Sequence, residues 1–172
     1  IGGSCVELRS RTSRLLVDFG IPLVSSHNVP FDVKILEKKS IDDLKKLKIL
    51  PEIDGLYAGE GKGIDAILLS HSHLDHYGFL KYVHPDIPIY LSEGAKELIK
   101  VSAMFTPAKI GVRNFHVINN KKKIRVGDCE ITSYVVDHSA FDARAFLIEA
   151  EGKRVFYSGD FRGHGRKGGL FK

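Results

Sequence analysis

One short phrase of the chain is dense in side chains that bind metals. Residues 70–76 read Ser-His-Ser-His-Leu-Asp-His and directly follow an apolar run at residues 64–69. Neutral imidazole is the commonest protein ligand for zinc and related metals, and carboxylate oxygen often completes the set. A lone histidine is usually a surface or hydrogen-bonded residue. Four residues of metal-binding type in one phrase therefore favour a metal site over unrelated polar residues.

The spacing within this phrase predicts two groups of ligands. His71 and His73 are two residues apart, so their side chains project to the same side of an extended backbone and can reach one ion. Asp75 and His76 come where the chain should enter a helix, so they leave in another direction and suit a neighbouring ion. The helix N-terminus adds positive potential, which favours hydroxide and phosphate oxygens at this place.

Two later phrases have the same character. His138 lies two residues after the end of an apolar strand predicted at residues 131–136, and Asp160 lies two residues after the end of another at 155–158. In open α/β sheets, ligands collect beyond the ends of the strands. We therefore expect His138 and Asp160 to join the first phrase, and Asp18, which ends an earlier strand, is a candidate for orienting a ligand.

The elements that must position these residues alternate between strands and helices. Residues 6–8 and 15–17 flank a polar turn and predict a β-hairpin, and the unbroken apolar run at 64–69 predicts a strand buried on both faces. Helices are expected from the cap Ser40 to Pro51, over residues 75–83, and from the cap Ser92. Further strands are predicted at residues 87–91, 115–118, 129–136, 145–149 and 154–158. A hairpin, a βαβα unit and a meander together indicate an α/β fold with a mixed sheet.

Composition narrows the class of protein. The 172 residues are 43% hydrophobic and 27% charged, so we expect residues 1–172 to form a single globular domain. No apolar run approaches the roughly 20 residues that cross a bilayer, so no membrane partner is predicted. Cys5 and Cys129 do not make a disulfide framework, and a cytoplasmic location is the expectation.

The net charge of the chain is only weak evidence for the kind of partner it binds. The net charge of +5 is compatible with an anionic partner such as nucleic acid, although solvated lysine runs explain much of it equally well. The basic clusters are Lys45-Lys46, Lys121 to Lys123, and Arg162 with Arg166-Lys167. The sequence starts at Ile1 without Met and stops in an apolar phrase, so we expect a domain that is incomplete at both ends.

The phrase His71-Ser-His73-Leu-Asp75-His76 matches the HxHxDH signature of the metallo-β-lactamase fold superfamily, and His138 and Asp160 follow in the order of that family. The contexts His138-Ser139 and Gly159-Asp160-Phe161-Arg162 resemble those of ribonuclease J and other nucleases with an inserted β-CASP domain. They resemble less the His-Thr-Pro-Gly phrase of hydrolases similar to glyoxalase II. The resemblance implies an αββα sandwich, of which this chain would hold mostly the N-terminal half.

The resemblance also implies a ligand set. His71, His73 and His138 would hold a first metal, and Asp75, His76 and Asp160 a second, with Asp160 bridging. The cofactor would be two zinc ions, or manganese or another divalent metal, sharing a hydroxide that attacks the substrate. Asp75 and His76 are the catalytic candidates, since Asp75 can also accept a proton from the attacking water. The candidates for orienting ligands or contacting substrate are Asp18, Ser139, Arg162 and His164.

One departure from the family is visible. The superfamily supplies a further histidine to the second metal well after the aspartate, and His164 is too close to Asp160 to be its equivalent. The prediction is a zinc-dependent phosphodiesterase, most simply a ribonuclease acting on RNA or other nucleic acid. Two alternatives stay open: a hydrolase of thioesters, lactones or cyclic nucleotides with the same fold, and a non-catalytic, metal-stabilised fragment. A homo-oligomer that completes the site jointly is also left open.

Overall fold

A computed structural model describes residues 3–25, 28–105, 114–165 and 169, so the cluster at Arg166-Lys167 lies outside the described residues. The first of two sheets is mixed, with strands in the order β1-β2-β3-β4-β5. Its strands are β1 (Val6–Arg9), β2 (Arg14–Val17), β3 (Ala66–Leu68), β4 (Ile89–Leu91) and β5 (Phe115–Val117). The pair β1–β2 is antiparallel and the other pairs are parallel.

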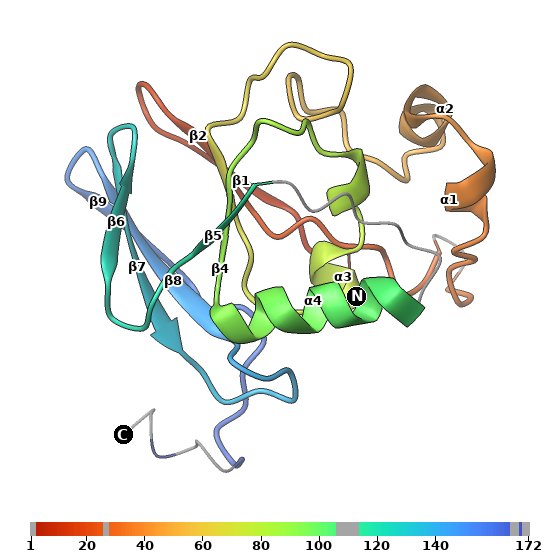
Figure 1. The fold of residues 1–172 in the computed structure, drawn as a ribbon. Helices are drawn as coiled ribbons and strands as arrows, with labels where there is room; N and C mark the ends of the chain where they lie inside the picture. The colour runs from red at the N-terminus through yellow and green to blue at the C-terminus, as the bar shows by residue number, and fades with distance from the viewer. Residues whose placement is uncertain (1–2, 26–27, 106–113, 166–168, 170–172) are drawn as a thin grey trace.

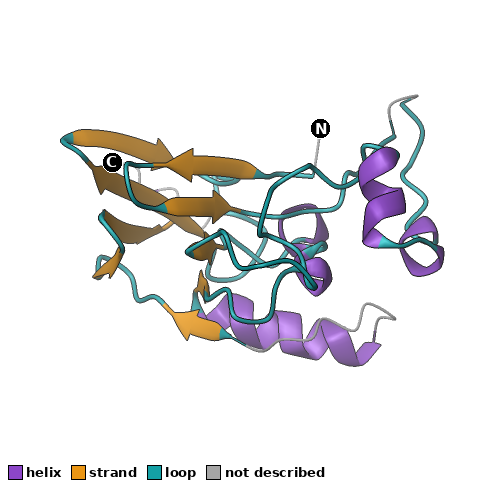
Figure 2. Ribbon diagram, turned by 90° about the horizontal axis from the view of Figure 1, so that it is seen from above, coloured by secondary structure: helices purple, strands orange, loops and turns teal. Residues whose placement is uncertain are grey.

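The second sheet is an antiparallel meander in the order β6-β7-β8-β9. Its strands are β6 (Lys123–Val126), β7 (Cys129–Val135), β8 (Arg144–Ala150) and β9 (Lys153–Tyr157). The helices are α1 (Ile35–Lys38), α2 (Ile41–Lys46), α3 (Leu74–Tyr77), the 3-10 turn η1 (Leu80–Tyr82) and α4 (Glu93–Phe105). Figure 1 shows the second sheet on one side of the molecule and α1 and α2 on the opposite side. In Figure 2, seen from above, α4 lies along the face of the first sheet that packs against the helices.

Side-chain alternation in the first sheet separates two hydrophobic cores. Leu15 and Val17 of β2 face the second sheet and pack in a cluster with Phe146, whereas Leu16 faces the helices. The neighbouring strand β3 divides in the same way, with Leu68 toward the second sheet and Ile67 toward the helices. Because the strand is covered on both faces, its sequence is an unbroken apolar run.

Most of the predicted architecture is confirmed. The mixed α/β arrangement is present, the hairpin pairs Val6 with Val17, and Ser40 caps α2 by accepting a hydrogen bond from Asp43 N (3.1 Å). The predicted end of this helix at Pro51 is wrong, because α2 ends at Lys46. No helix within the described part of the chain is long and apolar enough to cross a membrane.

The helix expected over residues 75–83 is wrong in its extent. The α-helix is the single turn Leu74–Tyr77, and η1 follows after Gly78. The chain leaves the helix because Phe79 turns into the core, where its N–H donates to Phe19 O (3.0 Å). Neither α1 nor β6 was predicted from the sequence, although charged residues alternate with Ile124 and Val126 in β6.

Candidate metal centre

The predicted ligands lie where strand ends of both sheets meet. Asp18 follows β2 and Ser70 closely follows β3, both at the carboxyl end of the parallel strands. The N–H of Arg144, at the start of β8, donates to Ser70 O (2.8 Å), which joins the two sheets at this point. His138 and Asp160, which follow β7 and β9, therefore arrive beside the phrase at residues 70–76.

Three imidazoles converge in the first group, which consists of His71, His73 and His138. His71 Nε2 lies 3.1 Å from His73 Nδ1, and His138 Nε2 lies 3.2 Å from the same His73 atom. Two nitrogens on a tetrahedral zinc ion, each at 2.0–2.1 Å, would be about 3.3 Å apart. The donor atoms and their separations therefore fit one divalent ion.

The second group consists of His71, His76 and Asp160, so His71 belongs to both groups. His76 Nε2 lies 3.6 Å from Asp160 Oδ2 and 3.8 Å from Asp75 Oδ2. The same Asp160 oxygen lies 3.8 Å from His138 Nε2 of the first group. Asp160 thus stands between the groups, with a half-exposed side chain, while His71 and His76 are buried beneath it.

Asp18 anchors this arrangement from below. Its side chain is fully buried, and its Oδ1 accepts a hydrogen bond from Ser70 N (2.7 Å). Its Oδ2 lies 2.7 Å from each of three donors, namely Ser70 Oγ, His76 Nδ1 and Tyr157 Oη. An ionised carboxylate only accepts, so His76 carries its proton on Nδ1 and turns the Nε2 lone pair toward Asp75 and Asp160.

Ser70 links Asp18 to His71 of the first group through its hydroxyl. Its hydroxyl proton is donated to Asp18, so its oxygen accepts from His71 Nδ1 at 2.9 Å. The lone pair of His71 then lies on Nε2, the atom that faces His73. One buried carboxylate in this way sets the tautomers of ligands in both groups.

The histidine pKa values differ between the groups. Burial, followed by the neighbouring imidazoles, lowers the pKa of His71 to about 2, and burial and His73 also lower the pKa of His138. For His76, burial acts to lower the pKa, but the hydrogen bond to Asp18 and the nearby carboxylates outweigh it, and the pKa is raised. His71 and His138 are therefore neutral, as metal ligands must be.

A close backbone contact positions Asp75 and His76. A Cβ atom added to Gly20 would come within 1.7 Å of Asp75 O, so the residue after Phe19 must be glycine. Phe19 N donates to His76 O (2.7 Å), and Ser4 N donates to Asp75 O (2.9 Å). The segment after β2 thus holds α3 against the end of the sheet.

Other predicted candidates lie at the edge of this centre or away from it. Ser139 and His164 are exposed, and neither belongs to the ligand groups. Arg162 Nε lies 3.8 Å from the buried Oδ2 of Asp137, and its side chain is 42% exposed. Ser70 and Tyr157 were not among the predicted site residues, although Tyr157 lies at the end of β9, close before Asp160.

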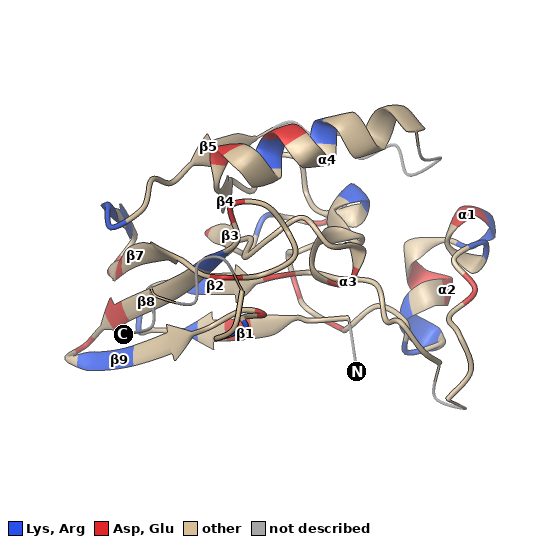
Figure 3. Ribbon diagram, turned by 90° about the horizontal axis from the view of Figure 1, so that it is seen from below, with Lys and Arg blue, Asp and Glu red and all other residues tan. Residues whose placement is uncertain are grey.

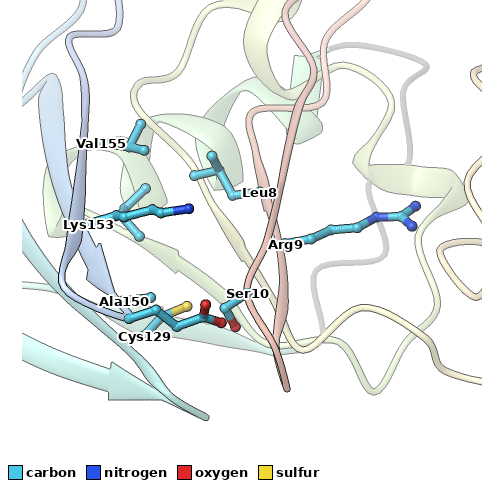
Figure 4. A pocket seen from close by; sticks show the side chains of 9 residues that line it. Leu8, Arg9, Ser10, Cys129, Ala150, Lys153 and Val155 are labelled. Atoms are coloured by element: carbon cyan, nitrogen blue, oxygen red, sulfur yellow. The ribbon is translucent and has the colours of Figure 1, made fainter.

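A cleft lies at the far ends of the strands. It is lined by apolar and charged side chains of β1, β7, β8 and β9, among them Leu8, Cys129, Ala150, Lys153 and Val155 (Figure 4). These residues surround the turns at Ser10 and Gly152, opposite the strand ends that carry Asp18 and Ser70. None of the predicted ligands lines this cleft.

Comparison with known proteins identifies the family. The chain belongs to the family described as "Beta-lactamase superfamily domain", whose model matches residues 55–167. It is 28% identical over 116 residues to ribonuclease J 2 of Streptococcus pyogenes, a match that covers 66% of this chain and 21% of that protein.

Solved structures agree on the fold. A protein of unknown function from Enterococcus faecalis superposes with a TM-score of 0.81 at 27% identity, over 97% of this chain and 42% of that one. The metallo-β-lactamase fold protein YhfI from Bacillus subtilis superposes with a TM-score of 0.58 at 20% identity, over 92% of this chain and 55% of that one. The chain thus has the metallo-β-lactamase fold and spans only about a fifth of the length of its ribonuclease relative.

Proposed function

We propose that this chain carries a two-metal hydrolase site that cleaves phosphodiester bonds in RNA. The observation that carries the proposal is the meeting of two ligand groups at His71, with Asp160 between them. Membership in a family typical of metal-dependent hydrolases and similarity to a ribonuclease support it.

Two sets of residues would each hold one metal ion. His71, His73 and His138 would hold a first zinc ion, and Asp75, His76 and Asp160 a second, with manganese or another divalent metal as the alternative. Two such ions, when bound, would supply a nucleophile from water at neutral pH and offset charge on the attacked group. Asp160, which is near both His76 and His138, is placed to bridge.

Side chains of the candidate centre would also accept a proton, exclude solvent and leave one side open to the substrate. Asp75 is mostly buried and faces His76 Nε2, so one of its oxygens can accept the proton of the attacking water. The buried rings of His71 and His76 exclude solvent from the inner side. Asp160 is 50% exposed, so the substrate would approach from its side.

Charge near the centre is compatible with a polyanion. Arg162 is exposed close after Asp160, and Ser139 is exposed next to His138, so both could contact phosphate. Figure 3 shows further Lys and Arg positions along the ribbon of β9, with acidic positions on the same sheet. His164 stays a candidate for substrate contact in this proposal.

Metal content and cleavage together test the proposal. The purified protein should bind about two zinc ions and cleave a labelled single-stranded RNA, and a chelator should abolish cleavage. His73→Ala should lose the activity, whereas the matched control His116→Ala, on the exposed side of β5, should keep it. Absence of bound metal, or full cleavage by His73→Ala, would refute the proposal.

The same assay separates the alternatives. Binding of RNA should weaken steeply as salt is raised, because phosphate contacts release counterions, whereas hydrolysis of a neutral thioester or lactone should not. Turnover of small esters without RNA cleavage would assign the site to small substrates. Bound metal without any turnover would make this chain a metal-stabilised fragment.

A further inference from the structure

The hydroxyl of Tyr157 lies in the hydrogen-bond network beneath the candidate metal centre, although no ligand role falls to it. It donates to Asp18 Oδ2 at 2.7 Å, the same oxygen that accepts from His76 Nδ1. Burial, followed by the charge of Asp18, raises the pKa of Tyr157, so the phenol stays protonated and remains a donor. The phenol can therefore donate to Asp18 at ordinary pH.

The tyrosine links two parts of the chain that must be aligned. Tyr157 ends β9, where it pairs with Phe146 of β8, and the chain then turns at Gly159 with φ 57° to present Asp160. Its ring packs on the core between the sheets, against the cluster that contains Val17 and Leu68. The hydroxyl thus ties the strand before Asp160 to the carboxylate that orients His76.

A second contact, at Gly159, holds the end of β9 against the segment that follows β3. A Cβ atom at Gly159 would lie 3.1 Å from both Arg144 O and Ser70 Cβ, so the backbone there already rests against the end of β3. This close packing limits the approach of β9, and the hydrogen bond from Tyr157 limits its rotation. His76 and Asp160 come from distant segments, and these two contacts keep their side chains facing each other at 3.6 Å.

We propose that Tyr157 is a positioning residue for the second metal site: its hydroxyl holds Asp18 in the orientation that keeps the His76 proton on Nδ1 and aligns β9 so that Asp160 meets His76. The inference rests on the proposed function for its metal readout. Removing the hydroxyl should disturb the second group more than the first, because Tyr157 closely precedes Asp160, whereas His71 is oriented through Ser70, which stays bound to Asp18 by two hydrogen bonds of its own.

Tyr157→Phe removes one oxygen and keeps the packed ring, and Tyr134→Phe, half-buried on β7 of the same sheet, is the matched control. In a competition titration with a chelating dye, Tyr157→Phe should bind the second zinc ion about 10- to 100-fold more weakly, with a clearly smaller loss of affinity for the first ion. Tyr134→Phe should bind both ions like the unmodified protein. Unchanged affinity for both ions, or an equal loss at both sites, would overturn the inference.

A measurement without metal separates this inference from the proposed function. In the metal-free protein, at a pH where His76 is neutral, the ¹⁵N shifts of His76 should report a proton fixed on Nδ1, and Tyr157→Phe should shift them toward a mixture of tautomers. If the unmodified protein binds no zinc, the proposed function fails and the ¹⁵N shifts still test the role of Tyr157. An Nδ1 proton that is equally fixed in both proteins would overturn that role.

Discussion

His138 Nε2 lies 3.2 Å from His73 Nδ1, although 65 residues separate the two histidines in the chain. The contact joins the end of β7 in the second sheet to the phrase that follows β3 in the first. Two imidazole nitrogens at this separation can share a cation or one hydrogen bond. A metal bound there would therefore link the two sheets as well as serve the reaction.

Zinc should accordingly stabilise the folded chain through this contact. At a free zinc concentration 100-fold above the dissociation constant, one site adds about 2.7 kcal/mol to the free energy of unfolding. His138→Ala should lose the contribution of the first site, and His116→Ala should keep it. Urea denaturation with and without zinc measures the difference. An equal effect of zinc on the unmodified protein and both variants would contradict the assignment of His138 to the first site.

The two ions should also differ in their response to acid. The pKa of His76 is raised, so on acidification a proton competes for its Nε2 before any proton competes at His71, whose pKa is lowered to about 2. Affinity for the second ion should fall by up to about tenfold per pH unit once His76 protonates, and affinity for the first should fall less. Chelator titrations at pH 7.5, 6.5 and 5.5 measure both, and earlier loss of the first ion would contradict this order.

The convergence of His71, His73, His138 and Asp160 could be predicted because each stands at or just beyond the end of an apolar strand. The triple use of Asp18 Oδ2 could not, since its donors Ser70, His76 and Tyr157 come together only through long-range packing of the two sheets. The extent of α3 was predicted wrongly for a related reason. Residues 75–83 are compatible with a helix locally, and only the core position of Phe79 ends it.

The buried carboxylate should matter for stability as well as for metal binding. Asp18→Ala would leave the donors Ser70, His76 and Tyr157 without their acceptor and place alanine at φ 58°. Breaking a buried, charged hydrogen-bond network in this way costs about 3–5 kcal/mol. Asp18→Asn is the matched variant, because asparagine tolerates positive φ and keeps one acceptor oxygen, and it should lose less, about 1–3 kcal/mol.

Urea denaturation of the metal-free proteins compares the two variants directly. Equal stability of Asp18→Ala and the unmodified chain would show that the network contributes little to folding. A loss in Asp18→Asn as large as in Asp18→Ala would assign the effect to charge rather than to the missing acceptor.

Gly20 should control the position of Asp75 and His76 without touching a metal. An alanine Cβ there would lie 1.7 Å from Asp75 O and 2.5 Å from His76 N, so the helix turn α3 must move away from the segment after β2. Because interiors are close-packed, such overpacking costs about 1–3 kcal/mol or more, and the shift displaces two ligands of the second site. Gly20→Ala should therefore weaken binding of the second zinc ion more than binding of the first.

Gly61→Ala is the control, since nothing lies within 4 Å of the added Cβ. Chelator titration and thermal unfolding of both variants measure the effect, and a Gly20→Ala protein with unchanged stability and zinc affinity would show that α3 is not held by this contact.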